Sequence, residues 1–92
     1  MNEKEREMVD HLMAAIMTLR TTEECEKFFV DVCSADELKK ISRRVQIAKL
    51  ITEGKTYRSI LEETNASNIT ISRLKNVMAD DDSVLAKVVK RI

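Results

Sequence analysis

Residues that interrupt regular structure are almost absent from this chain, which has no proline and one glycine, Gly54, among 92 residues. A β-sandwich needs many tight turns, and glycine and proline are the residues that most often form them. The sequence therefore excludes an all-β fold and predicts an all-α chain of about six helices. Aromatic residues make up only 3% of the chain, so the core must be aliphatic. A chain this small buries about 60–65% of its unfolded surface, which favours a homodimer.

Apolar residues recur at spacings of three and four along residues 8–19, which predicts a first amphipathic helix. Two sequences typical of capping boxes follow it. Thr21 with Glu24 predicts the start of a second helix, and Ser34 with Glu37 predicts the start of a third. The expected inner face of the third helix is formed by Leu38, Ile41, Val45, Ala48 and Ile51.

The single glycine is placed where the third helix should end, because Gly54 can adopt the positive φ of a C-terminal cap. Thr56 can then cap a helix of about eight residues, and Ser67 can cap another. The acidic stretch 80–83 interrupts the pattern and caps a last helix. We expect this last helix to contain Val84, Leu85, Val88, Val89 and Ile92. The first four of these residues are expected to pack on the body of the protein.

The two short helices after Gly54 have the pattern of a helix-turn-helix. Asn65 lies at the turn, where a left-handed conformation is needed and asparagine is the best substitute for glycine. The predicted inner positions are Ile60, Thr64, Ala66, Ile71 and Leu74. The predicted outward positions of the second helix are small, polar or basic, as in helices that enter a DNA groove: Ser67, Asn68, Thr70, Ser72, Arg73 and Lys75. The alternative is a plain helical hairpin with a polar face.

Charge is unevenly distributed, although 16 basic and 16 acidic residues give a net charge of zero. Residues 1–38 contain 4 basic and 10 acidic residues, a net charge of −6. Residues 39–75 contain 9 basic and 3 acidic residues, a net charge of +6. A local basic region is what contact with phosphate requires. The alternative for such a run is a solvated helix face.

Three stretches resemble the Trp repressor family, in particular its YerC/YecD-type branch: residues 33–48, 53–60 and 65–73. The resemblance covers about residues 8–80. It implies an all-helical, intertwined homodimer of one domain, with dimerisation helices in 1–53, the helix-turn-helix in 54–79 and a C-terminal helix in 80–92. It also implies a transcriptional regulator, a repressor, that binds double-stranded DNA through two helix-turn-helix units about one helical turn apart.

The pattern and the resemblance together give one set of candidate DNA-binding residues. Most of them lie on the second helix of the helix-turn-helix, and the others lie just before and within the first. Arg58 on the first helix is expected to reach a guanine edge or a phosphate, and Arg44 is a further phosphate candidate. The set is Lys55, Thr56, Tyr57, Arg58, Ser67, Asn68, Ile69, Thr70, Ser72, Arg73 and Lys75.

An effector site is implied by the resemblance alone. The residues that hold L-tryptophan in the founding member of the family match Ser34, Arg44 and Arg73. Leu74, however, stands where the family has a glycine, and its side chain would intrude on an indole-sized pocket. We therefore expect no cofactor, and a tryptophan-like corepressor remains the alternative.

Other functional classes have little support in the sequence. The single histidine, His11, has no nucleophile or phosphate-binding loop to accompany it, so we expect neither an enzyme nor a metal site. No stretch approaches the ~20 apolar residues of a membrane span, and no signal-peptide core is present, which predicts a cytoplasmic protein. The main alternative to DNA binding is a helical protein-interaction module.

Overall fold

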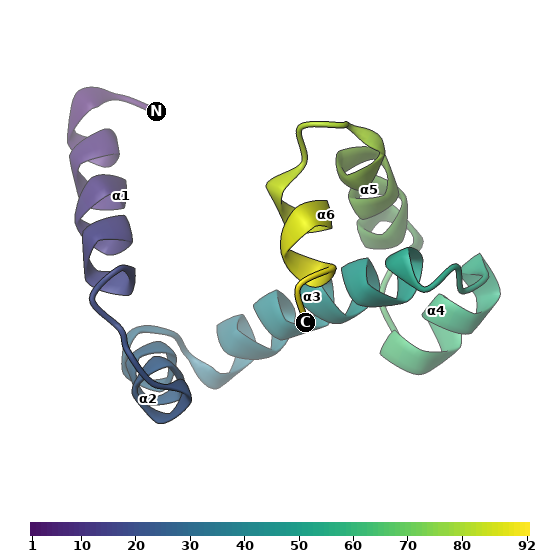
Figure 1. Ribbon diagram of the computed structural model, residues 1–92, viewed down its shortest axis with the longest axis horizontal. Coiled ribbons are helices and arrows are strands. Elements are labelled where there is room, and N and C mark those ends of the chain that lie inside the picture. Colours follow the sequence, from purple (N-terminus) through teal and green to yellow (C-terminus); the bar gives the residue numbers. More distant parts are fainter. The chain divides into compact units, whose positions relative to one another are not determined.

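Six α-helices and no strand form the computed structural model, which describes all of residues 1–92 (Figure 1). This confirms the predicted all-α class. The helices are α1 (Glu3–Ile16), α2 (Thr22–Val32), α3 (Ala35–Thr52), α4 (Tyr57–Thr64), α5 (Asn68–Ala79) and α6 (Val84–Val89). The chain divides into two units, residues 1–35 and residues 36–92, and each is described by itself. None of the helices is both long and apolar enough to cross a membrane.

In the first unit, α1 is shorter at its C-terminal end than the apolar pattern of residues 8–19 predicted. It ends at Ile16, because the backbone N–H and the hydroxyl of Thr18 both donate to the carbonyl of Ala15 and close the last turn. At its other end, Asn2 and Glu5 form a capping box that the sequence analysis did not identify.

The predicted start of α2 is confirmed, with a small difference in its capping. The Thr21 hydroxyl accepts a hydrogen bond from the Glu24 backbone N–H at 3.1 Å. The Glu24 carboxylate accepts from the N–H of Arg20 rather than from that of Thr21. Neither α1 nor α2 contains a buried residue, so the apolar side chains of both helices are at most half-buried in the single chain.

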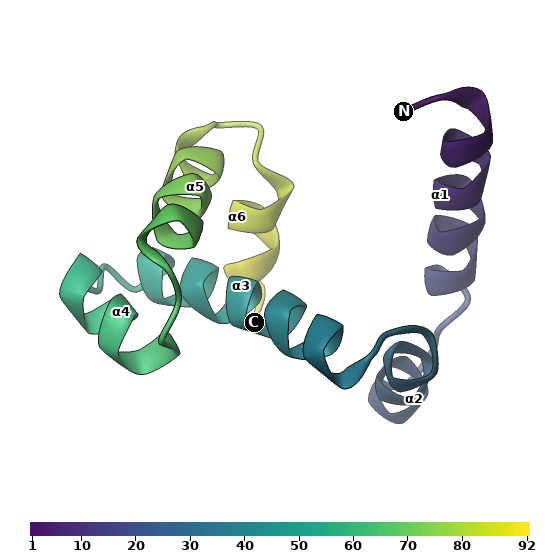
Figure 2. The same cartoon turned by 180° about the vertical axis from the view of Figure 1, so that it is seen from behind.

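The second unit contains the core, where α3, α4, α5 and α6 meet (Figures 1 and 2). All five predicted inner positions of the helix-turn-helix are buried, with exposed fractions from 0% to 9%. Part of the predicted inner face of α3 is confirmed, since Ala48 is fully buried and Ile51 packs against the core. Ile41 and Val45 are exposed in the single chain, and Ile47 and Leu50, which were not predicted, are buried. The core cluster consists of Ile47, Leu50, Ile60, Ala66, Ile71 and Leu74.

The C-terminus of α3 is capped by the single glycine, as predicted. Gly54 has φ +76°. Its N–H donates to the carbonyl of Ile51, and the N–H of Lys55 donates to the carbonyl of Leu50, which is the hydrogen-bond pattern of a Schellman motif. α3 therefore ends abruptly, and the chain turns into α4.

α6 begins after Ser83, whose hydroxyl accepts from the Ala86 N–H at 3.1 Å. Val89 is fully buried and Leu85 packs against the core, as expected. The expectation that Val84 and Val88 also pack on the body is wrong, because these side chains are exposed. Ile92 lies beyond the end of α6, where its backbone oxygen accepts from the Lys49 ammonium at 3.1 Å.

Candidate nucleic-acid interface

The turn between α4 and α5 is fixed by short-range hydrogen bonds. Asn65 adopts the left-handed conformation, with φ 53° and ψ 30°, and its N–H donates to the carbonyl of Leu61. The buried Thr64 hydroxyl donates to the carbonyl of Ile60 at 2.7 Å and accepts from the N–H of Ala66 at 3.3 Å. α4 and α5 therefore form the predicted helix-turn-helix, with every polar group at the buried turn satisfied.

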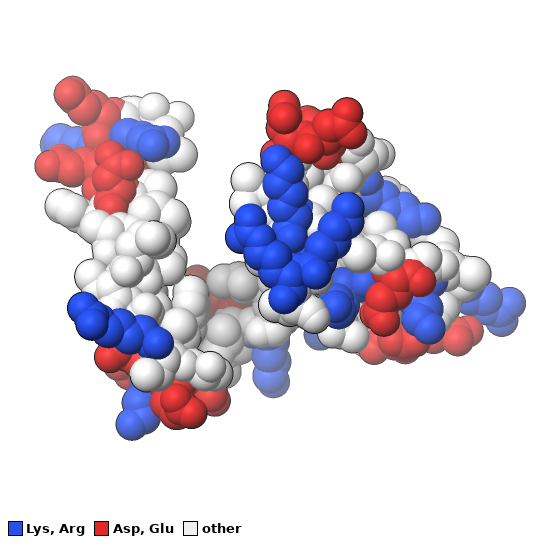
Figure 3. All heavy atoms as spheres, in the orientation of Figure 1, with Lys and Arg blue, Asp and Glu red and all other residues white.

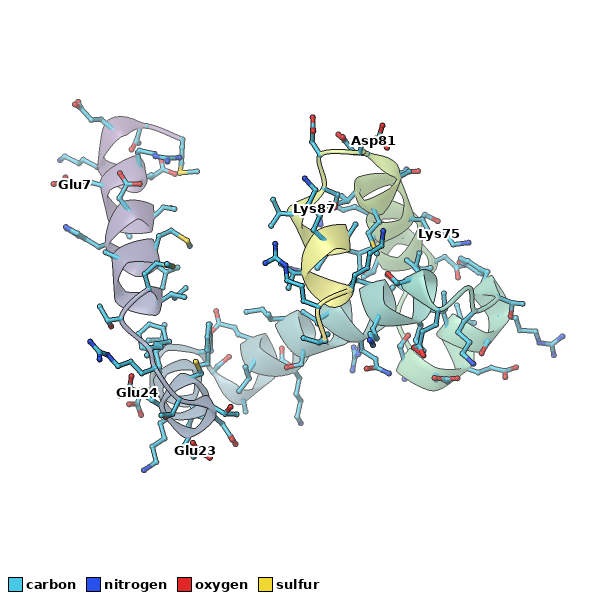
Figure 4. All side chains as sticks on the ribbon, viewed as in Figure 1. Glu7, Glu23, Glu24, Lys75, Asp81 and Lys87 are labelled. Carbon is cyan, nitrogen blue, oxygen red and sulfur yellow. The ribbon has the colours of Figure 1, made fainter.

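α5 presents one face to the core and the other to solvent. Ile71 and Leu74 are buried, and Lys75 projects from the outer side of the helix (Figure 4). The Ser67 hydroxyl caps the helix by accepting from the Thr70 N–H at 3.2 Å. Thr70 itself is half-buried, and its hydroxyl lies 2.9 Å from that of Ser67. The predicted contact residues of α5 that are exposed are Ser67, Asn68, Ile69, Ser72, Arg73 and Lys75.

The start of α4 lies against α5 through one side chain. The Tyr57 hydroxyl donates a hydrogen bond of 2.5 Å to Oδ1 of Asn68, and the Lys75 ammonium lies 5.6 Å from the centre of the Tyr57 ring. Thr56 caps α4 by accepting from the Ser59 N–H at 3.1 Å. Lys55, Thr56 and Tyr57 are therefore placed at the exposed entry to the helix-turn-helix.

Arg58 is held on its own helix. Its Nε lies 3.2 Å from Oε1 of Glu62, one turn further along α4. The Arg58 side chain is 89% exposed, and exposed ion pairs of this kind are weak. The guanidinium can therefore exchange this carboxylate for another acceptor at little cost.

A basic groove of about 290 Å³ lies between α3 and the start of α5. Its lining residues are Lys40, Arg43, Arg44, Ala66, Ser67 and Thr70. Of the three residues matched to an effector site, only Arg44 lines this groove. Arg73 lies on the exposed face of α5, and Ser34 belongs to the first unit.

The sequence analysis did not single out Lys40 and Arg43 as site residues. Their spacing could have identified them as a basic cluster, because positions 43 and 44 are three and four residues after position 40 and share one side of a helix with it. Lys40 is also paired with Asp36, with 3.3 Å between Nζ and Oδ2.

Charged side chains form further patches on the second unit. Basic side chains gather over α6, and an acidic patch covers the turn that precedes it (Figure 3). The sequence of this region contains Asp80, Asp81 and Asp82 before α6 and Lys87, Lys90 and Arg91 within or after it. No three histidine, cysteine or acidic side chains gather in an arrangement that could hold a metal ion.

Residues 7–92 match the family model described as Trp repressor protein. The chain belongs to the Trp repressor family. It is 40% identical over 70 residues to YerC of Bacillus subtilis (strain 168), a protein described as uncharacterised, and this match spans 76% of the chain and 67% of YerC.

Two solved structures agree with the assignment to the Trp repressor family. A crystal structure of a candidate Trp repressor from Staphylococcus aureus aligns with a TM-score of 0.84 at 36% identity, over 99% of this chain and 94% of that one. A TrpR-like protein from Eubacterium eligens aligns with a TM-score of 0.83 at 35% identity, over 92% of this chain and 88% of that one. The Trp repressor family is one of DNA-binding regulators with a helix-turn-helix, and not one of enzymes.

Proposed function

We propose that this protein is a sequence-specific transcriptional repressor that acts in the cytoplasm as a homodimer and binds double-stranded DNA through α4 and α5. The observation that carries the proposal is the outer face of α5. Apart from Ile69, its exposed side chains are small, amide-bearing or basic, while Ile71 and Leu74 anchor the opposite face in the core. A helix with this division can lie in a major groove without losing its packing.

Two kinds of DNA contact follow from the geometry. Lys55, Lys75 and Arg44 are exposed cations that we assign to phosphates. Asn68, Arg58 and the exposed Ile69 are assigned to base edges, with the apolar Ile69 suited to a thymine methyl group. Thr56, Ser67, Thr70, Ser72 and Arg73 complete the proposed contact surface. Tyr57, the remaining candidate, borders this surface, and we do not count it among the phosphate contacts because its hydroxyl already donates to Asn68.

The homodimer is supported by apolar side chains that the single chain leaves uncovered. Neither α1 nor α2 buries any residue. On α3, Ile41 is 42% and Val45 is 38% exposed. We assign these faces to a second copy of the chain. Such a dimer also provides the two helix-turn-helix units that operator binding needs.

A tryptophan corepressor is not part of the proposal. Leu74 is 4% exposed and belongs to the core, so its side chain fills the space that a glycine would leave open. Arg44 lines the basic groove together with Lys40 and Arg43, and Arg73 is not among the lining residues, which supports a phosphate contact for Arg44.

The test is fluorescence anisotropy with selected genomic duplexes at low and high salt, with and without tryptophan. Three phosphate contacts per protomer give about six per dimer, and such a dimer loses about 10³-fold in affinity between 50 and 200 mM salt. We expect saturable binding with this salt dependence and no change on adding tryptophan. A folded dimer that binds no duplex at low salt would contradict the proposal and would favour the protein-interaction module.

A further inference from the structure

Tyr57 joins the two helices of the helix-turn-helix at their solvent-exposed side. It is the first residue of α4, and its hydroxyl donates to the amide oxygen of Asn68, the first residue of α5. Its ring faces the Lys75 ammonium at 5.6 Å. Asn68 and Lys75 are seven residues apart and therefore lie on the same side of α5. The Tyr57 side chain thus contacts two α5 residues of the proposed contact surface, Asn68 and Lys75.

The hydrogen bond restricts what Asn68 can offer to a base. An asparagine amide has one acceptor oxygen and an –NH₂ group with two donors. Recognition of adenine by asparagine uses both, because the oxygen accepts from N6 while the nitrogen donates to N7. Oδ1 has two lone pairs, and one of them already accepts from the phenol at 2.5 Å, so the two donors of the –NH₂ group are the better-placed part of the amide for DNA.

We propose that Tyr57 is a positioning residue for base recognition, which turns the Asn68 amide so that its –NH₂ group faces a guanine in the major groove. Guanine presents two acceptors there, N7 and O6, whereas adenine presents one acceptor and one donor. An –NH₂ group therefore favours guanine over adenine at this position. This inference rests on the proposed DNA-binding function and assigns a base preference to one of its contacts.

Tyr57→Phe isolates the hydroxyl. Phenylalanine retains the ring that faces Lys75, so only the hydrogen bond to Asn68 is removed. Thr52→Val is the matched control, because it also removes one hydroxyl from the second unit, where Thr52 donates to the carbonyl of Ala48. Tyr57 is an exposed residue, so we expect Tyr57→Phe to fold with an unchanged melting temperature.

The experiment compares the full-length wild type, Tyr57→Phe, Asn68→Ala, the double variant and Thr52→Val on a duplex library randomised across the binding site. In Tyr57→Phe, we expect the guanine-to-adenine preference to fall by about tenfold at one base pair in each half-site. Affinity for unrelated duplex and the salt dependence should not change. Asn68→Ala should lose the preference at the same base pair, and the double variant should be no worse than Asn68→Ala alone. Thr52→Val should keep the wild-type preference.

Other outcomes separate this inference from the proposed function. If the wild type binds no duplex, both the function and this inference are wrong. If the wild type binds but Tyr57→Phe keeps its base preference while Asn68→Ala loses it, Tyr57 does not position the amide. A uniform loss of affinity on all duplexes in Tyr57→Phe would make the hydroxyl a phosphate contact and would equally overturn the inference.

Discussion

Two isoleucines of α5, two positions apart, have opposite surroundings. Ile71 is fully buried in the core, whereas Ile69 is 82% exposed. An isoleucine this exposed contributes little to the packing of its own chain. Its place on the outer face of α5 fits a contact with a partner. Burial therefore places Ile71 in the core and leaves Ile69 available for the proposed contact with DNA.

Alanine substitutions at Ile71 and Ile69 test this difference between a core position and a proposed contact position. Ile71→Ala should lower the free energy of unfolding by about 2–5 kcal/mol, because it leaves a cavity in the core. Ile69→Ala should change it by less than about 0.5 kcal/mol and should weaken binding to the selected duplex. Urea unfolding and anisotropy measure the two effects. Equal destabilisation by the two variants would mean that Ile69 is also packed.

Arg58 has two partners available to it, Glu62 in the free protein and DNA in the proposed complex. In the free protein it pairs with Glu62 at 3.2 Å, and exposed helical pairs contribute about 0.3–0.5 kcal/mol. Arg58→Ala should therefore leave the melting temperature nearly unchanged. We expect it to weaken specific binding by about 1–3 kcal/mol and nonspecific binding much less.

The control for Arg58→Ala is Glu62→Gln, which removes the competing carboxylate and should not reduce affinity. Anisotropy on the selected duplex and on an unrelated duplex separates the two kinds of binding. An equal loss on both duplexes in Arg58→Ala would make Arg58 a phosphate contact only.

At the scale of elements, the angle between α4 and α5 depends on the backbone of one residue. Asn65 has φ 53°, a conformation that costs most residues about 1–2 kcal/mol. Ile60, Thr64 and Ala66, on either side of the turn, are all buried. The backbone of the turn therefore cannot change its conformation without moving side chains of the core. A change at Asn65 therefore acts on the whole helix-turn-helix.

Asn65→Ala should destabilise the protein by about 1 kcal/mol, while Asn65→Gly should be close to neutral, since glycine adopts positive φ without strain. Thermal unfolding monitored by circular dichroism compares the two variants with the wild type. Equal stability of Asn65→Ala and the wild type would show that the turn relaxes into another conformation.

At the scale of the whole molecule, the single chain leaves much apolar surface without cover. The exposed residues of this kind in α1, α2 and α3 include Met8, Met13, Val30, Ile41 and Val45. No residue of the first unit is buried in the single chain, and the proposed homodimer would cover these faces.

Val45→Asp tests the dimer, and Val77→Asp is its matched control, because both valines are 38% exposed on long helices. Val45→Asp should shift the mass in solution from dimer to monomer and lower the melting temperature, since it places a charge in the proposed interface. Val77→Asp should remain dimeric. Light scattering coupled to gel filtration gives the masses, and a dimeric Val45→Asp would remove α3 from the interface.

Much of the fold is determined by local signals in the sequence. The hydroxyls of Thr21, Thr56, Ser67 and Ser83 cap the helices that follow them, and Gly54 and Asn65 have the predicted positive φ. Each of these features depends on residues within one helical turn of one another. A single sequence is therefore sufficient to predict them.

The tertiary structure decided the features that depend on residues distant along the chain. The side of α3 that is buried depends on how α4, α5 and α6 pack against it. The helical period alone therefore identified Ala48 and Ile51 as inner positions but could not show that Ile47 and Leu50 are buried while Ile41 and Val45 are exposed in the single chain. The basic groove exists because α5 begins beside Lys40 and Arg43. The bond from Tyr57 to Asn68 spans 11 positions and crosses the turn. No local pattern encodes such contacts, because they arise only when two helices meet.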